Sequence, residues 1–246
     1  MLKKLYEKSE IWFALAWIIG YVVLASTGDN ISADLGIDKI VTLPILIAMS
    51  AILYLFVRKN GLTEKYGLCR SKLPAAKMLC YIPLLLLLTA NLWYGARMNM
   101  SPLETVLYIL SMFCVGFLEE LIFRGLLFQA MAKDGVKTAM IVSSVTFGIG
   151  HIVNLINGSG AELLPNLLQV MYAMAIGFAF VMIFCRTGSL MPCIIVHSVF
   201  NGLSAFANEA VMTPRRQIIS GVLLTVIGGG YALYLALAVK EENIKE

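Results

Sequence analysis

Eight apolar runs, each close in length to a membrane-spanning helix, leave this chain few ways to fold. A helix needs ~20 apolar residues to cross ~30 Å of hydrocarbon. The runs lack the in-and-out alternation of a barrel strand, so α-helices are the expected spanning elements. They cover residues 11–26, 40–57, 78–94, 105 to beyond 118, 138–156, 167–185, 190–207 and 217–239.

The composition argues against a soluble protein. Of the 246 residues, 59% are hydrophobic and 14% are charged, and the mean hydropathy is +0.83. Soluble domains hold roughly 25% charged residues, so this chain has too little polar surface to cover a water-facing core. Disorder, nucleic-acid binding and a secreted disulfide scaffold are excluded as main interpretations. We expect an all-α polytopic membrane protein of about eight transmembrane helices, forming one integral membrane domain over residues 1–246.

The basic residues indicate how the protein sits in its membrane. With eight spans, 15 of the 19 lysines and arginines fall on the side that holds both termini. The other side holds only Lys39, Arg97, Arg215 and Arg216. Basic residues favour the cytoplasmic side, so we expect a multi-pass protein of the cell membrane with its N- and C-termini in the cytoplasm.

A few ionisable residues interrupt the apolar runs. Glu119, Glu120 and Arg124 lie in the fourth run, and the only two histidines, His151 and His197, lie in the fifth and seventh. A charge at the centre of a bilayer costs at least ~2.5–3.5 kcal/mol, so such groups are candidates for function.

Helical spacing gives the two glutamates different surroundings. Glu120 and Arg124 are four residues apart, close enough on a helix to form a charge-assisted pair. Glu119 points ~100° away and has no polar partner one turn before or after it. Gly135 lies midway between Glu119 and His151, so a helical hairpin turning there brings these two side chains to nearly the same depth. We expect them to share one water molecule.

Other residues of the later spans have simpler expected roles. His197 and Asn201 are four residues apart, so both side chains face one way on a helix. Phe147, four residues before His151, is expected to pack against it. The glycines at positions 148, 150, 177 and 228–230 predict close contacts between helices.

These residue types together indicate peptide hydrolysis. A carboxylate beside a neutral histidine can deprotonate water, and a second histidine with an amide can donate hydrogen bonds to a developing oxyanion. The four aspartates are expected in loops, which argues against an aspartyl pair within the membrane. The chain has no HExxH zinc motif, and Ser159 lies in a polar loop, so glutamate is the remaining candidate base.

The ordered motifs resemble those of the CPBP family, also called the Abi or type II CAAX prenyl protease family. The motifs are Glu119-Glu120-x-x-x-Arg124, Phe147-x-x-x-His151 and His197-x-x-x-Asn201. The resemblance covers about residues 105–206, the four-helix catalytic core of that family.

The resemblance implies an intramembrane glutamic endopeptidase with an eight-helix fold. In that family's terms, Glu119 and His151 would activate water, while His197 and Asn201 would form the oxyanion hole. The supporting residues would be Glu120, Arg124 and Phe147. The expected partners are a peptide or membrane-protein substrate and the lipid bilayer, without nucleic acid.

Three alternatives stay open on the sequence alone. Members of this family were long described as metalloproteases, and Glu119, His151 and His197 also form a possible zinc set, although we favour a site without a cofactor. Other members are linked to bacteriocin immunity or to protein partners, so a non-hydrolytic immunity or scaffold protein is the second interpretation. An ion-coupled transporter that uses the same buried acids and histidines is the third.

Overall fold

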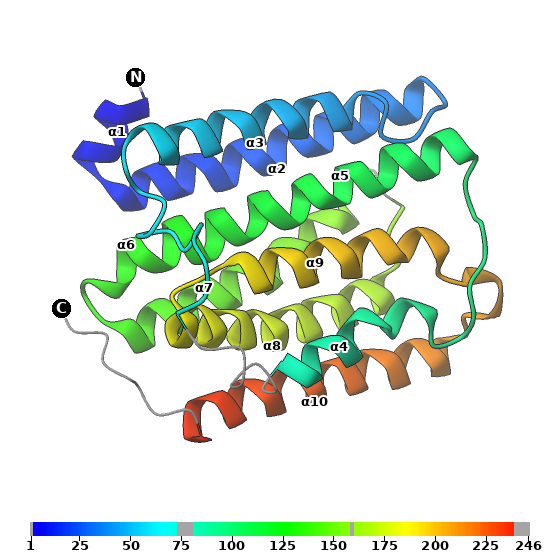
Figure 1. Cartoon of the computed structure of the whole chain (residues 1–246). Coiled ribbons are helices and arrows are strands. Elements are labelled where there is room, and N and C mark those ends of the chain that lie inside the picture. The colour runs from blue at the N-terminus through cyan, green and yellow to red at the C-terminus, as the bar shows by residue number, and fades with distance from the viewer. Residues whose placement is uncertain (1, 73–80, 158–159, 239–246) are drawn as a thin grey trace.

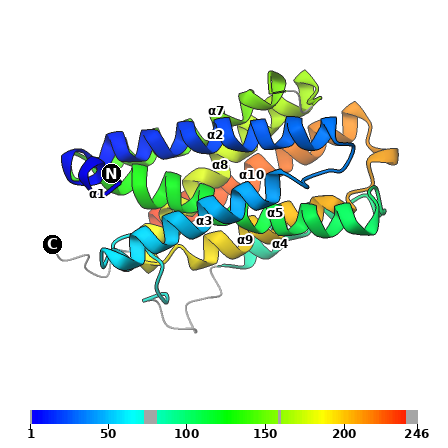
Figure 2. The ribbon, with the colours of Figure 1, turned by 90° about the horizontal axis from the view of Figure 1, so that it is seen from above.

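The protein is an all-helical bundle, seen here in a computed structural model that describes residues 2–72, 81–157 and 160–238. Figure 1 shows the helices stacked side by side, and Figure 2 shows them still roughly parallel after a quarter turn. The described residues contain no β-strand, only an isolated bridge between Ala96 and Ala207. The helices are α1 (Leu2–Lys8), α2 (Glu10–Asp34), α3 (Thr42–Lys59), α4 (Ile82–Leu88), α5 (Pro102–Glu120), α6 (Gln129–Ala132), α7 (Val136–Gly150), α8 (Leu163–Thr187), α9 (Met191–Leu203) and α10 (Pro214–Ala238).

The expected polytopic all-helical membrane architecture is confirmed, although the helices differ in length from the expected spans. Six helical segments within the described residues are long and apolar enough to cross a bilayer. They are Glu10–Asp34, Thr42–Lys59, Pro102–Ala132, Val136–Leu155, Leu163–Thr187 and Pro214–Leu237. The seventh expected span is the shorter apolar helix Met191–Phe206. The protein is therefore a multi-pass membrane protein.

The third expected span is the least regular. Within the described residues, α4 has only seven residues and is followed by a short 3₁₀ helix, η2 (Ala90–Leu92). The helix α2 is longer than its apolar run predicts, because it continues to Asp34. Asp29 and Asp34 thus lie on a helix, and the expectation that they lie in loops is wrong. Some residues of the expected spans, loops and basic termini lie outside the described residues. They are Lys77, Met78, Ser159, Val239, Lys240 and Lys245.

The fourth span changes its helical geometry directly after the two glutamates. The α-helix α5 passes into a π-helix, η3 (Leu121–Phe128), whose eight residues are all buried. Short π segments widen a helix and are frequent at functional sites. The Ser143 hydroxyl of α7 donates a hydrogen bond to the Phe123 carbonyl oxygen at 2.8 Å. A polar side chain of the neighbouring helix therefore satisfies a carbonyl within this irregular segment.

Glycines let several helices approach closely, and the sequence predicted only some of these glycines. A Cβ added at Gly148 would lie 2.9 Å from the Val170 carbonyl oxygen of α8, and one at Gly228 would lie 3.0 Å from Ile176. Gly177 also faces a close neighbour, the Arg124 side chain. Gly150, Gly229 and Gly230 face open space, so the expectation of close contact is wrong for them.

Gly116 brings α5 against α9, which carry most of the candidate site. A Cβ at this position would lie 2.7 Å from the backbone nitrogen and 2.9 Å from the Cα atom of Ser198. Ser198 directly follows His197, and Gly116 precedes Glu119 by less than one turn. The absence of a side chain at Gly116 therefore sets how closely Glu119 and His197 can approach.

We expect Gly116→Ala to lower the free energy of unfolding by about 1–3 kcal/mol, because the new methyl group would push α5 away from α9. Unfolding by sodium dodecyl sulfate in mixed micelles measures this change. Gly202→Ala is the matched control at the same helix interface, since its added Cβ would have its nearest neighbour at 3.8 Å. Equal stability of the two variants would contradict the close approach at Gly116.

Candidate active site

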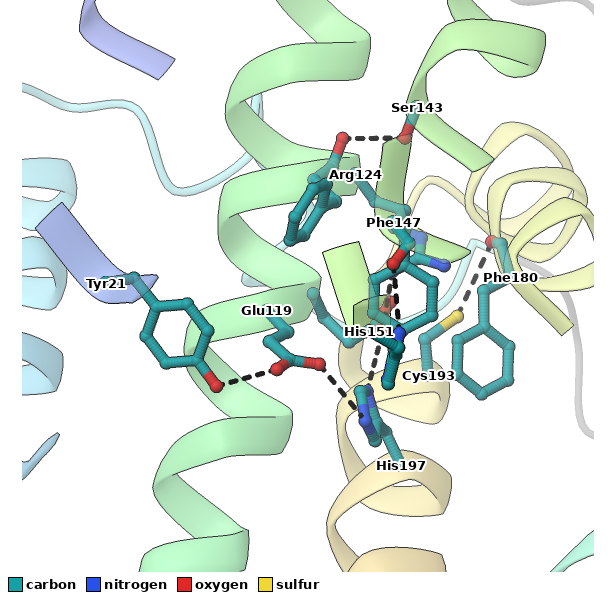
Figure 3. Close-up of polar contacts among 11 residues, drawn as sticks. Tyr21, Glu119, Arg124, Ser143, Phe147, His151, Phe180, Cys193 and His197 are labelled. Carbon is teal, nitrogen blue, oxygen red and sulfur yellow. Dashed lines mark hydrogen bonds and ion pairs between the residues drawn. The ribbon is translucent and has the colours of Figure 1, made fainter. Parts of the chain in front are cut away.

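Glu119 has a hydrogen-bond partner that its own helix does not supply. It lies one residue before the end of α5, and its Oε1 atom accepts a hydrogen bond from the Tyr21 hydroxyl of α2 at 2.6 Å (Figure 3). Its Oε2 atom lies 3.5 Å from Nε2 of His197. The expectation that Glu119 lacks a partner holds along its own helix and is wrong for the bundle. Tyr21 gave no signal in the sequence, because it is one aromatic residue in an apolar run.

Glu120 is the centre of a buried charged cluster, as its spacing to Arg124 predicts. The Arg124 guanidinium donates a hydrogen bond from Nη1 to Glu120 Oε1 at 3.1 Å, and both side chains are fully buried. The same oxygen lies 2.8 Å from Nδ1 of His197. Because a carboxylate accepts hydrogen bonds, this contact assigns a proton to Nδ1 of His197.

Phe147 connects the charged cluster to both histidines. The Arg124 guanidinium lies over the Phe147 ring, with its central carbon 3.9 Å from the ring centroid. The Phe147 ring also forms T-shaped pairs with the rings of His151 and His197, with centroid distances of 5.2 and 5.8 Å. A cation over an aromatic face gains electrostatic energy, most of all where water is excluded. Phe147 therefore packs as expected, and it also stabilises the buried arginine.

His151 is held at both its side chain and its backbone. It begins the 3₁₀ helix η4 (His151–Leu155), where α7 ends. Its Nδ1 atom lies 3.1 Å from the Phe147 carbonyl oxygen, and its own carbonyl accepts a hydrogen bond from the Asn166 side chain at 2.8 Å. A carbonyl oxygen only accepts, so the contact assigns the proton to Nδ1. The lone pair of Nε2 is then free to accept a proton.

A cavity of about 470 Å³ joins residues of the first span to those of the later motifs. Glu119, His151 and Asn201 all line it, as does Tyr21. His197 and Asn201 line an adjoining pocket of about 50 Å³ together with His151. The fold thus gathers the predicted residues around connected space. His197 is within ion-pair distance of Glu119, whereas His151 shares only the lining of the larger cavity with it.

The two histidines of the possible zinc set each use Nδ1 for a contact within the protein. Nδ1 of His197 contacts Glu120, and Nδ1 of His151 contacts a backbone carbonyl. Among the residues that the structure describes, no three histidine, cysteine, aspartate or glutamate side chains converge as metal ligands. Three protein ligands around one point are typical of catalytic zinc.

The central part of the chain matches a known family. Residues 101–203 match the family described as Type II CAAX prenyl endopeptidase Rce1-like. The matched segment runs from the residue before α5 to the last residue of α9 and contains all three motifs. It confirms the family resemblance drawn from those motifs. No curated protein and no solved structure gives a match to the chain.

We expect Arg124→Met to lower the free energy of unfolding by about 3–5 kcal/mol, because it leaves the Glu120 carboxylate buried without its cation. Adding Glu120→Gln should restore much of this loss, since the double variant no longer buries the charge pair. A double-mutant cycle in mixed micelles measures the coupling. A double variant less stable than Arg124→Met alone would contradict the pairing.

Proposed function

We propose that this chain, whose residues 101–203 match the Rce1-like family of CAAX prenyl endopeptidases, is an intramembrane glutamic endopeptidase. It would hydrolyse a peptide bond of a membrane-associated peptide or protein. The main support for the proposal is the cavity of about 470 Å³ in the helical bundle, which Glu119, His151 and Asn201 all line. A carboxylate, an imidazole and an amide that line one cavity can act on one bound peptide bond.

In the proposed reaction, Glu119 and His151 activate a water molecule. The carboxylate and the free Nε2 lone pair of His151 are both acceptors, so either can take a proton from water while the other orients it. The water oxygen then attacks the carbonyl carbon of the peptide bond. The proton passes to the leaving nitrogen, the carbon–nitrogen bond breaks, and a carboxylate and an amine are released.

His197 and Asn201 are the proposed donors to the oxyanion. They lie one turn apart on α9, so their side chains project to the same side of the helix. The contact of His197 Nδ1 with Glu120 fixes the ring and directs Nε2 toward Glu119 and the reaction site. With a proton on Nε2 as well as on Nδ1, His197 is an imidazolium cation, and together with the amide of Asn201 it would stabilise the negative oxygen of the tetrahedral intermediate.

The remaining motif residues have a supporting role in this proposal. Glu120 and Arg124 neutralise each other and hold His197, while Phe147 packs against Arg124 and against both histidines. Tyr21 adds a positioning contact, since its 2.6 Å hydrogen bond fixes one oxygen of Glu119 and leaves the other directed at the site. Catalytic groups held in place before substrate binds need no reorganisation during the reaction.

The proposed location is the cell membrane, with both termini in the cytoplasm. The distribution of basic residues supports this orientation, because 14 of the 19 fall on the side of the termini when the buried Arg124 is left out. The helix α1 and the last turns of α10 lie at the same end of the bundle in Figure 1, as an orientation with both termini on one side requires.

Glu119→Gln and His151→Ala should each lower the cleavage rate by about 10²–10⁴-fold, because each removes a group that handles the proton of water. The substrate is obtained by capturing peptides on the Glu119→Gln protein and identifying them by mass spectrometry. Cleavage is then measured on the captured peptide with purified full-length protein in lipid.

Glu7→Gln is the matched control, since it makes the same carboxylate-to-amide change on the exposed helix α1. Wild-type cleavage rates in either Glu119→Gln or His151→Ala would contradict the proposed chemistry. An unchanged cellular phenotype in both variants would instead favour the non-hydrolytic immunity or scaffold role.

We further propose that the reaction needs no metal, and we expect a chelator to leave the cleavage rate unchanged. Metal analysis of the purified protein should give much less than one zinc ion per chain. Stoichiometric zinc that is lost on treatment with the chelator, together with activity, would overturn this part of the proposal. The Glu119→Gln protein is the companion sample, because a ligand substitution would lower any specific metal content.

A further inference from the structure

The small pocket of about 50 Å³ adjoins the candidate site on the side of α8 and α9. Five of its lining residues are spaced by three, one, three and four positions along α8, so they share one face of that helix. They are Gln169, Tyr172, Ala173, Ile176 and Phe180. Among the described residues, none from α2, α3 or α5 lines this pocket. Figure 3 shows Tyr21 and Glu119 on one side of the two histidines and Phe180 on the other.

Four residues line both the small pocket and the larger cavity. They are Phe147, His151, Gln169 and Asn201, so these side chains form the boundary between the two spaces. Three of the four are polar, and His151 and Asn201 belong to the proposed catalytic groups. A molecule in the small pocket is therefore beside His151 without occupying the larger cavity.

The size of the small pocket suits water. Pockets for small organic ligands measure roughly 300–1,000 Å³, several times more than the volume of about 50 Å³ found here. One water molecule needs ~10–15 Å³ of such space. The pocket therefore has room for about three to five water molecules.

The polarity of the lining also favours water. A buried water molecule makes about three hydrogen bonds, and apolar cavities of similar shape stay dry. The small pocket has five polar side chains in its wall, which are those of His151, Gln169, Tyr172, His197 and Asn201. The lining that the structure describes includes no carboxylate, lysine or arginine. Imidazole, amide and hydroxyl groups offer both donors and acceptors, as water requires.

Gln169 is the polar residue of this boundary that the proposed reaction does not use. Its Oε1 atom accepts a hydrogen bond from the Asn154 side chain of η4 at 3.4 Å, its one side-chain hydrogen bond within the described residues. Both N–H groups of its amide are thus available to a water oxygen. The opposite part of the wall is apolar, because Leu87, Phe180 and Ala173 are 1, 2 and 3% exposed. Water in the pocket is therefore held at the polar side that borders His151.

We propose that the small pocket binds water molecules and supplies the water that Glu119 and His151 activate. A peptide that fills the larger cavity displaces water from it, so a supply behind His151 and Gln169 stays available after the substrate has bound. Gln169 is the positioning residue through which water passes between the two spaces. The supply role rests on the proposed function, whereas the binding of water in the pocket does not.

The first test detects the water without any substrate. A short synchrotron X-ray pulse converts bound water into hydroxyl radicals, which oxidise the side chains beside it. Full-length protein in lipid nanodiscs is irradiated, and mass spectrometry locates the oxidised residues. We expect Phe180 and Tyr172 to be oxidised severalfold faster than Phe184. Phe184 is the matched control, since it lies one turn further along α8, is 4% exposed and does not line the pocket.

The second test fills the pocket by two steps of side-chain size, Ala173→Val and Ala173→Leu. Oxidation of Phe180 should fall in that order, and so should kcat on the captured peptide, by about tenfold or more for Ala173→Leu, because water is no longer held beside His151. Binding of the fluorescent peptide should stay unchanged when each substitution is combined with Glu119→Gln. Ala179→Val is the matched control, because Ala179 is a buried alanine of α8 outside the pocket. Thermal unfolding checks that each variant is folded.

Oxidation of Phe180 and Tyr172 no faster than that of Phe184 would show a dry pocket and overturn the inference, even if neither Ala173 variant folds. Loss of this oxidation in Ala173→Leu with a wild-type kcat would overturn the supply role. An equal fall of kcat in Ala179→Val would assign the effect to packing and overturn that role as well. Rapid oxidation of Phe180 in a protein that cleaves no captured peptide supports the water site and contradicts the proposed hydrolase.

Discussion

The buried contact of Glu120 with Arg124 and His197 is the interaction on which the site depends. An ionised group inside lipid is stable only when another group of this protein compensates it. Here one oxygen of Glu120 contacts two groups, the guanidinium of Arg124 on the same span and the imidazole of His197 on α9. The Phe147 ring covers the guanidinium. This cluster joins α5, η3, α7 and α9 at the depth where the candidate catalytic residues lie, so packing and charge compensation position them together.

The cluster also explains why two adjacent glutamates have different environments. Glu120 points into the packed interior and shares its charge with Arg124. Glu119, on the next face of the helix, borders the cavity and is held by the neutral Tyr21 hydroxyl. A neutral donor fixes a carboxylate without cancelling its charge, which keeps it able to accept a proton. The close approach of α5 to α9 at Gly116 brings His197 beside this carboxylate. One residue pair thus supplies both a structural anion and the anion that we propose as the reactive one.

Local spacing predicted part of this arrangement, and long-range packing determined the rest. The Glu120–Arg124 pair follows from a four-residue separation, which any helix converts into proximity. The contact of Tyr21 with Glu119 joins residues 98 positions apart, and nothing in the pattern of an apolar run indicates which aromatic residue will face an acid. Apolar length predicted the all-helical membrane fold. It did not predict that α2 continues to Asp34, since a helix can extend past its apolar run, and it placed Asp29 in a loop.

The most direct test of the central claim is an experimental structure of the Glu119→Gln protein with a captured peptide. We predict that the uncleaved carbonyl group lies in the cavity between residue 119 and His151, with its oxygen directed at His197 and Asn201. A peptide seated elsewhere would contradict it, for example in the apolar groove that Leu86 and Tyr231 line between α4 and α10. The same contradiction would follow if the carbonyl lay in the cavity but beyond reach of a water molecule held by residue 119 and His151.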